Sequence, residues 1–293
     1  MYDVVQHGHA RELLARSGAC LEKRESENNL PYGLAHTLAR DPRYYGHEPL
    51  LLLSIEESGS PVGVAVRTPP LRIVLSRFDM DIVAAMDRLV GFLRDNGVQF
   101  PGIVGPESEA RCFADAWVKA NPGLAAAIST RLRVFEARSV VDVPLAPGSL
   151  RLAETEDLAL MAKWIEAFSR EEAVGEASVS AEAMEKAKKY IGEESMYIWD
   201  HDGPVSIAKE SRAMKTGTNV GLVYTPPEFR GRGYATSCVH QLTKKLLAGG
   251  YRFCSLYTDL ANPTSNHIYP KIGYVPLGDT LIFDFECATG LAE

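Results

Sequence analysis

The stretch Arg230-Gly231-Arg232-Gly233-Tyr234-Ala235 decides the fold of this chain. An apolar run with strand character, 220–225, precedes it, and the pair Pro226-Pro227 interrupts that run. A segment with helical periodicity follows, from about residue 233 to residue 247. A strand, a glycine-containing loop and a helix start together bind anions, because the loop N–H groups converge and the helix N-terminus adds partial positive charge. The stretch therefore predicts a ligand that carries phosphate.

The glycine spacing excludes two common phosphate-binding loops. A dinucleotide-binding loop needs GxGxxG, but Thr236 stands at the position of the third glycine. The P-loop pattern GxxxxGK[ST] is absent as well. Spacing alone leaves open a plain strand-to-helix turn that binds nothing.

A second stretch lies about thirty residues downstream and reads Asn262-Pro263-Thr264-Ser265-Asn266-His267-Ile268-Tyr269-Pro270-Lys271-Ile272-Gly273-Tyr274. It resembles the NxxSxxxYxKxGF segment of the GNAT superfamily, the acetyl-CoA-dependent N-acyltransferases. The glycine stretch matches that family's pyrophosphate loop, [R/Q]xxGx[G/A], and residues 223–229 resemble its fourth strand and bend. Two motifs in the right order are more specific than either one. The resemblance covers about 150–285, and the whole chain resembles a bacterial two-domain type with a degenerate GNAT-like N-terminal half.

The resemblance implies an α/β (mixed α+β) fold with two GNAT-like domains in tandem, each a mostly antiparallel mixed sheet flanked by helices. Pro144, Pro147 and Gly148 independently mark a joint, which predicts domains at 1–145 and 146–293. In the second half, the periodicity predicts helices at 154–168, 180–191 (capped by Ser180), 233–247 and 264–271, strands at 150–152, 196–199, 204–209, 219–225 and 252–258, and a closing hairpin of 274–276 with 280–285. In the first half, it predicts helical regions at 10–39, 82–96 and 107–120 and strands at 50–55, 62–66, 71–75, 103–104 and 132–137.

The corresponding turn of the first half, residues 76–81, contains no glycine. Without glycine the backbone does not easily fold around a phosphate. We therefore expect the ligand site in the second domain and not in the first.

The resemblance assigns the binding of acetyl-CoA, a co-substrate, to three segments. Gly231 and Gly233 would expose backbone amides to the pyrophosphate at the point where Tyr234 and Ala235 enter the helix. Arg230 and Arg232 would steer or contact the phosphates, or form a solvated basic surface. The backbone of residues 223–225 (Val223, Tyr224 and Thr225) would pair with the pantetheine arm as an added strand. Asn262 would bind the pantetheine region or, alternatively, cap a loop. Ser265, in the same motif, would also contact the cofactor or, together with Asn266, cap the short helix.

The catalytic prediction rests on Tyr269, whose phenol would protonate the departing CoA thiolate. Many GNAT enzymes carry a glutamate base near the start of the fourth strand, but residues 216–220 contain no acid. Glu210, on the preceding strand, is the nearest candidate, and Glu171, Glu172 and Asp259 are others. A water relay, or an acceptor that arrives as the neutral amine, would need none of them.

An acidic cluster marks the predicted acceptor end: Glu166, Glu171, Glu172 and Glu176. The resemblance places this region beside the acceptor, a small-molecule or peptide amine, and negative potential would draw a cationic one. An ordinary charged helix surface is the alternative interpretation.

The bulk composition of the 293 residues is that of an ordinary soluble protein, with 46% hydrophobic residues and a net charge of −7. The charge argues against nucleic acid as the main partner, and the sequence shows no apolar run of membrane-spanning length and no signal peptide. We expect a cytoplasmic enzyme with no metal, since the five cysteines are scattered. The resemblance predicts an N-acetyltransferase; the rival hypothesis is a non-catalytic acyl-CoA-binding regulatory or interaction module.

Overall fold

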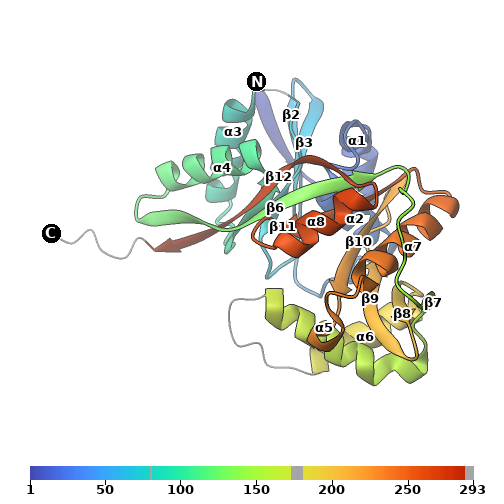
Figure 1. Ribbon diagram of the computed structural model, residues 1–293. Coiled ribbons are helices and arrows are strands. Elements are labelled where there is room, and N and C mark those ends of the chain that lie inside the picture. The colour runs from blue at the N-terminus through green and yellow to red at the C-terminus, as the bar shows by residue number, and fades with distance from the viewer. Residues whose placement is uncertain (80, 173–180, 288–293) are drawn as a thin grey trace.

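The structure, a computed structural model, describes residues 1–79, 81–172 and 181–287. They form a twelve-stranded mixed sheet with helices on both faces, in the order β1-β2-β3-β4-β5-β12-β6-β11-β10-β9-β8-β7 (Figure 1). This confirms the predicted mixed α/β class.

The first half contributes β1 (Tyr2–Gln6), α1 (Ala10–Glu22), α2 (Asn29–Arg40), β2 (Leu51–Glu57), β3 (Ser60–Arg67), β4 (Ile73–Leu75), α3 (Ile82–Asp95), β5 (Gly102–Pro106), α4 (Glu107–Ala120) and β6 (Leu124–Ala137). The second half contributes β7 (Ser149–Leu152), a 3-10 turn (Thr155–Asp157), α5 (Leu158–Glu172), α6 (Ala181–Gly192), β8 (Met196–Asp200), β9 (Pro204–Glu210), β10 (Gly217–Tyr224), a second 3-10 turn (Pro227–Phe229), α7 (Tyr234–Ala248), β11 (Phe253–Asp259), α8 (Pro263–Lys271) and β12 (Val275–Cys287).

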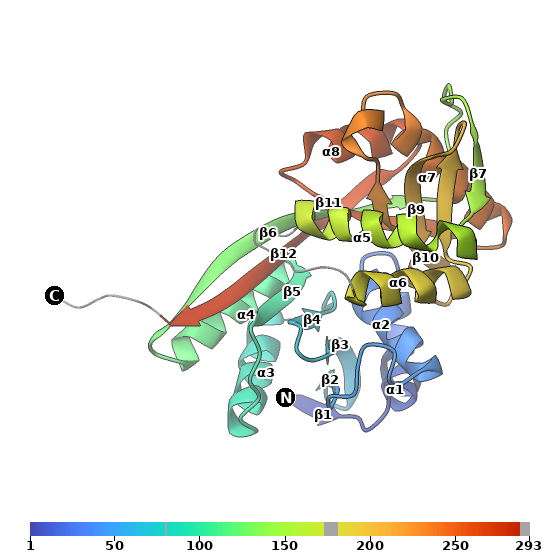
Figure 2. The ribbon, with the colours of Figure 1, turned by 90° about the horizontal axis from the view of Figure 1, so that it is seen from below.

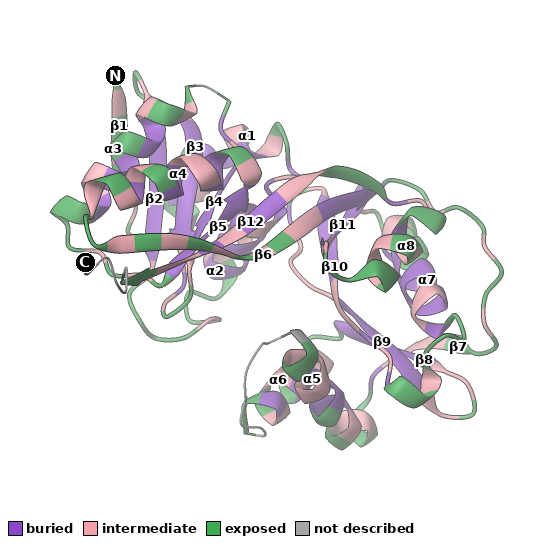
Figure 3. Ribbon diagram, turned by 60° about the vertical axis from the view of Figure 1, so that its left-hand side comes forward, coloured by how far each residue is buried: buried purple, intermediate pink, exposed green. Residues whose placement is uncertain are grey.

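Each face of the sheet has its own hydrophobic core. In the first half, α3 and α4 pack on one face and α1 and α2 on the other (Figure 2). Strand β2 shows the period of two directly: Leu51, Leu53 and Ile55 enter the α3/α4 core, and Leu52 enters the α1/α2 core. In the second half, α7 and α8 cover one face and α5 and α6 the other. The strands are therefore buried where helices cover both faces (Figure 3).

The two halves share their longest strands. Strand β12 pairs antiparallel with β5 of the first half, from Thr280 to Asp284, and β6 pairs antiparallel with β11 of the second half. The strands β6 and β12 also pair with each other along most of their length. The predicted joint near residue 145 lies between β6 and β7, but the sheet continues across it, so the two-domain boundary stays a prediction.

We expect the replacement of Leu281 by Ala to destabilise the whole chain. Leu281 lies on β12, is 1% exposed and packs in the α3/α4 core of the first half. A buried Leu→Ala change costs about 2–5 kcal/mol of unfolding free energy. Denaturant unfolding measures this. Val275→Ala, at the exposed start of the same strand, is the control and should cost less than about 0.5 kcal/mol; equal losses in the two variants would contradict the shared core.

Two predicted elements differ in kind from the structure, and the strand predicted at 132–137 is longer, Leu124–Ala137. The helical region 10–39 is two helices, because Asn28 uses its side chain between them: its Nδ2 donates to the Leu21 carbonyl, and its Oδ1 accepts from Arg77 N–H. The predicted closing hairpin is the single strand β12, in which a bulge between Pro276 and Gly278 replaces the turn. Strand β1 was not predicted. The expected cap Ser180 lies outside the described residues.

Candidate active site

Two neighbouring strands diverge at the centre of the second half. Strand β10 pairs in parallel with β11 at Gly217, Thr218 and Asn219. Beyond Asn219, β10 continues to Tyr224 beside β9, while β11 continues beside β6. The pairing of β10 with β9 shifts register between Gly221 and Tyr224. Leu222, within this interval, has a φ of 48°, a value that is rare for a bulky residue. The edge of β10 that faces β11 is therefore open to an added, strand-like ligand.

The glycine loop leads from this strand into α7. Gly231 and Gly233 have φ of 74° and 80°, in the left-handed region that other residues rarely adopt. Gly233 is the N-cap of α7, and no side chain caps the helix. The first N–H groups of α7 have no partner within the helix, and a Cβ built at Gly231 would meet no atom within 4 Å. The loop thus fits a pyrophosphate that approaches from the open side.

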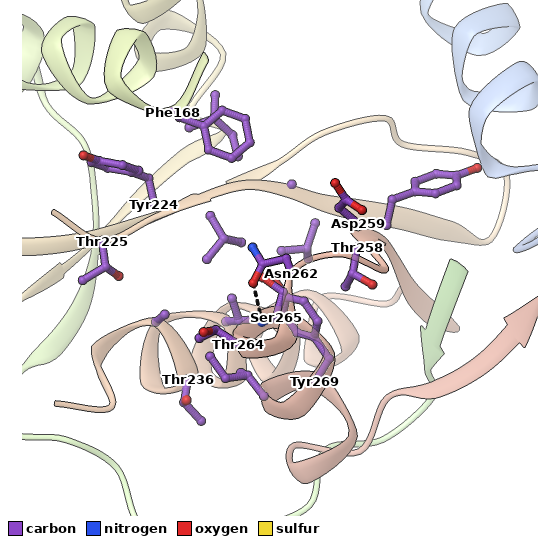
Figure 4. Close-up of a pocket in the computed structure, with 18 of the residues that line it drawn as sticks. Phe168, Tyr224, Thr225, Thr236, Thr258, Asp259, Asn262, Thr264, Ser265 and Tyr269 are labelled. Atoms are coloured by element: carbon purple, nitrogen blue, oxygen red, sulfur yellow. Dashed lines mark hydrogen bonds between the residues drawn. The ribbon is translucent and has the colours of Figure 1, made fainter. Parts of the chain in front are cut away.

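A cavity of about 820 Å³ joins the glycine loop to the diverging strands (Figure 4). The predicted site residues in its lining are Val223, Tyr224, Thr225, Arg230, Gly231, Gly233, Tyr234, Ala235, Asn262, Ser265 and Tyr269. Two predicted residues, Glu210 and Arg232, do not line it.

Tyr269 lies on α8, is 6% exposed and lines the cavity. Its ring contacts those of Phe135 and Tyr274, with centroids 6.4 and 5.9 Å away. These aromatic neighbours restrict the rotation of the ring, so the side chain is held in place before a ligand binds. Figure 4 shows it below Asn262 and Ser265.

The loop before α8 is held by its own polar side chains. Asn262 Oδ1 accepts from Ser265 N–H at 3.1 Å, which is the capping role considered above (Figure 4). Asn266 donates to the carbonyls of Asp259 and Asn262, and Thr258 Oγ1 donates to Asn266 Oδ1 at 2.6 Å. These bonds fix the loop against the end of β11. Asn262 still lines the cavity, so the capping role does not exclude contact with a ligand.

Arg230 connects the glycine loop to α5. Its Nη2 contacts both carboxylate oxygens of Glu171, at 2.6 and 2.8 Å, and its Nε donates to the Thr225 carbonyl at 2.8 Å. The guanidinium also lies over the Tyr224 ring. Arg232 is exposed. The first arginine thus positions the loop, and the second matches the alternative of a solvated surface residue.

The predicted acids separate into two groups. Glu210 lies outside the cavity lining: its Oε1 accepts from Thr218 Oγ1 at 3.2 Å, and burial together with this carboxylate raises the pKa of Tyr251 to about 12. Asp259 and Glu171 line the cavity. The position of Glu210 gives no support to its predicted role as the base.

The acidic cluster is partly neutralised. Glu171 pairs with Arg230, and Glu166 pairs with Arg170. The side chain of Glu172 and all of Glu176 lie outside the described part of the chain. The two members whose side chains the structure describes are therefore paired with arginines and are not free negative charges.

Sequence reasoning missed four polar residues of the cavity lining, which lie on β10, on β11 and in the loop before β10. Ser211, Arg212, Asn219 and Tyr257 line the cavity where β10 and β11 separate. Asn219 is 3% exposed, and a lone Asn in an apolar strand was the available signal. Arg212 stands in an ordinary polar loop sequence, which gave no signal of a binding role.

The equivalent position of the first half is filled by its own side chains. Phe78 is 4% exposed and lies against Gly63, where an added Cβ would come within 2.5 Å of the ring. Its N–H donates to Glu109 Oε1 at 3.0 Å, and Arg77 pairs with the same carboxylate. A carboxylate of the protein itself thus accepts from the backbone N–H of this turn, which agrees with the expectation drawn from the absence of glycine.

The last observations concern the cysteines, metal ligands and membrane-spanning helices. Burial raises the pKa of the thiols of Cys254, to about 12, and of Cys238, so neither is a ready nucleophile. Among residues 1–79, 81–172 and 181–287, no three His, Cys, Asp or Glu side chains are placed to hold a metal ion. None of the helices described is long and apolar enough to cross a bilayer.

Comparison with known proteins agrees with this geometry. Residues 202–281 match the family model described as FR47-like protein, which is related to GNAT. A GNAT-family acetyltransferase from Colwellia psychrerythraea is 12% identical with a TM-score of 0.57 (98% of this chain and 99% of that one covered). A GCN5-related N-acetyltransferase from Sphaerobacter thermophilus is 13% identical with a TM-score of 0.59 (97% and 95%). A tandem GNAT protein from the clavulanic acid biosynthesis pathway is 10% identical with a TM-score of 0.55 (100% and 100%).

No curated protein matches the chain in sequence. The structural similarities extend over nearly the whole chain and include a tandem protein. The predicted resemblance to the GNAT superfamily is confirmed, and the chain has a GNAT-like fold.

Proposed function

We propose that the chain is an N-acetyltransferase that transfers an acetyl group from acetyl-CoA to an amine by direct attack in a ternary complex. One observation carries the proposal: a single cavity joins the glycine loop, the open edge of β10 and Tyr269. A pyrophosphate, an extended arm and a thioester could therefore bind within one continuous cavity.

The residues of this cavity divide the binding of acetyl-CoA between them. The amides of Gly231, Gly233 and the first turn of α7 would hold the pyrophosphate. The open edge of β10 would pair with the pantetheine arm as an additional strand. Acetyl-CoA supplies an acetyl thioester, which would then lie near the point where β10 and β11 separate.

The chemistry follows from the groups around that point. A backbone N–H of β10 would polarise the thioester carbonyl. The acceptor nitrogen forms a bond to the carbonyl carbon as the bond from carbon to sulfur breaks, and Tyr269 donates its proton to the sulfur. Two of the predicted acids line the cavity, and Glu171 is paired with Arg230, so Asp259 would take the proton from the amine. No cysteine enters the reaction.

The decisive experiment measures acetyl-CoA binding and turnover separately. Equilibrium titration with acetyl-CoA tests the cavity, and a panel of amines, followed by release of free CoA thiol and detection of the acetylated amine, tests the reaction. Binding with amine-dependent thiol release supports the proposal. Binding without turnover on any amine supports the regulatory module instead, and absence of binding overturns both.

We expect the two candidate bases to respond differently to the same substitution. Glu210→Gln should leave kcat/KM within about twofold, because its carboxylate contacts Thr218 outside the cavity lining. Asp259→Asn should lower kcat by about 10²-fold or more, the usual contribution of a general base. Steady-state kinetics with the same amine measures both. A loss above tenfold in Glu210→Gln would return the base role to that residue.

A further inference from the structure

An arginine lines the cavity away from the glycine loop, near the point where β10 and β11 separate. Arg212, in the loop between β9 and β10, lines the cavity together with Asn219, which lies near the start of β10. The glycine loop lies beyond the other end of this strand, after Thr225. Thr225 is six positions beyond Asn219 along the chain, roughly 20 Å at the usual strand rise. If the pyrophosphate binds at the glycine loop, the arm leads toward Arg212, so this end receives the acceptor.

The positive charge of Arg212 is not neutralised within the described residues. Its Nη2 donates to Asn219 Oδ1 at 3.1 Å, and its buried Nε has no hydrogen-bond partner there. Arg230, the other arginine in the lining, is paired with Glu171. Arg212 is half-buried, and a guanidinium that lines a cavity without an anionic partner is well suited to bind a carboxylate through two parallel hydrogen bonds.

The surroundings of Arg212 hold it in position. Asn219 donates to Ser255 Oγ at 3.3 Å and lies 3.5 Å from Asn29 Oδ1 at the start of α2. Tyr257, also in the lining, accepts from the same Asn29. Gly33 of α2 packs directly on the arginine stem, since an added Cβ would come within 2.6 Å of Arg212 Cβ. Helix α2 of the first half therefore supports Arg212, Asn219 and Tyr257 from behind the cavity lining.

We propose that the acceptor carries a carboxylate as well as its amine, as an amino acid does, and that Arg212 binds this carboxylate. The inference rests on the function proposed above and specifies its substrate class. With the carboxylate on Arg212, the amine is directed toward the separation of β10 and β11, where the thioester is expected. The first half then has a definite role: its helix α2 supports the arginine that selects the acceptor.

The test compares amino acids with their decarboxylated amines and their carboxamides as acceptors. We expect kcat/KM for the preferred amino acid to exceed that for its amine and its amide by about 10²-fold or more, because a site built to bond a polar group discriminates strongly against analogues that lack it. This comparison uses the wild-type chain and depends on no variant. Equal rates for acid, amine and amide would overturn the inference.

Substitutions then assign the effect to Arg212. Arg212→Gln should remove the preference for the acid, and Arg212→Lys should restore part of it, while the dissociation constant of acetyl-CoA stays within about twofold, because the arginine lies away from the glycine loop. Lys215→Gln is the matched control: it removes a positive charge from the same loop, but Lys215 is exposed and pairs with Glu22. A preference that persists in Arg212→Gln overturns the role of this residue.

The outcomes distinguish this inference from the function on which it rests. If acetyl-CoA binds and amines are acetylated without regard to a carboxylate, the function stands and the inference fails. If acetyl-CoA does not bind, both fail. An acid preference that disappears in Arg212→Gln, with acetyl-CoA binding intact, supports both.

Discussion

Replacement of Tyr269 by Phe is expected to lower kcat by about 10²–10⁴-fold, the usual contribution of a positioned general acid. Only the phenol oxygen is lost, and the ring keeps its contacts with Phe135 and Tyr274. The KM for acetyl-CoA should change little, because the glycine loop and the edge of β10 carry the binding. Steady-state kinetics together with equilibrium titration of acetyl-CoA measures the two effects independently.

Tyr274→Phe is the matched control for this change. Tyr274 is 1% exposed and bonds Thr243 Oγ1 at 2.8 Å, and it does not line the cavity. Its loss should cost about 1 kcal/mol of stability, the contribution of one hydrogen bond, and leave kcat within about twofold. If Tyr269→Phe behaved in the same way, the proton donor would have to be another group.

Gly231→Ala and Gly233→Ala together are expected to weaken acetyl-CoA binding by about 10²-fold. Each alanine would have to hold a positive φ, at a cost of about 1–2 kcal/mol, and each 1.4 kcal/mol corresponds to a tenfold change in affinity. When the loop relaxes to relieve this strain, its amides no longer converge on the pyrophosphate. Equilibrium titration with acetyl-CoA measures the loss.

Gly59→Ala provides the control for backbone strain alone. Gly59 has φ 78° in the turn between β2 and β3, and, as at Gly231, an added Cβ would meet no atom within 4 Å. It should lower stability to about the extent of one of the two loop substitutions, without any change in acetyl-CoA affinity. If the loop variants keep wild-type affinity while losing stability, the glycines serve the fold and not the ligand.

The glycine loop and α7 were predictable because their signals are local. The helix expected at 233–247 is Tyr234–Ala248, and the two glycines fall where the chain needs a positive φ. The placement of Tyr269 and Asn262 in the cavity lining followed from a motif and not from physical reasoning about either residue. Alone, a buried Tyr and a capping Asn are ordinary structural residues.

The remaining features depend on contacts between distant segments, which no local pattern records. The alternation of β12 does not say that its partners are β5 and β6. Glu210 and Arg212 are two residues apart, yet the bend of the chain after β9 places the second in the cavity lining and not the first. The support of Arg212 by Gly33 joins positions that are far apart in the sequence.

The exchange of long strands also has a consequence during synthesis on the ribosome. Strand β12 stands between β5 and β6 but is translated after every other strand described here. Until it emerges, the nascent first half has no partner for the edge of β5, and such an open edge invites pairing with other chains. The sheet of the first half therefore cannot be completed until nearly all of the second half has been synthesised. A chaperone that covers the edge of β5 would be most useful before β12 is available.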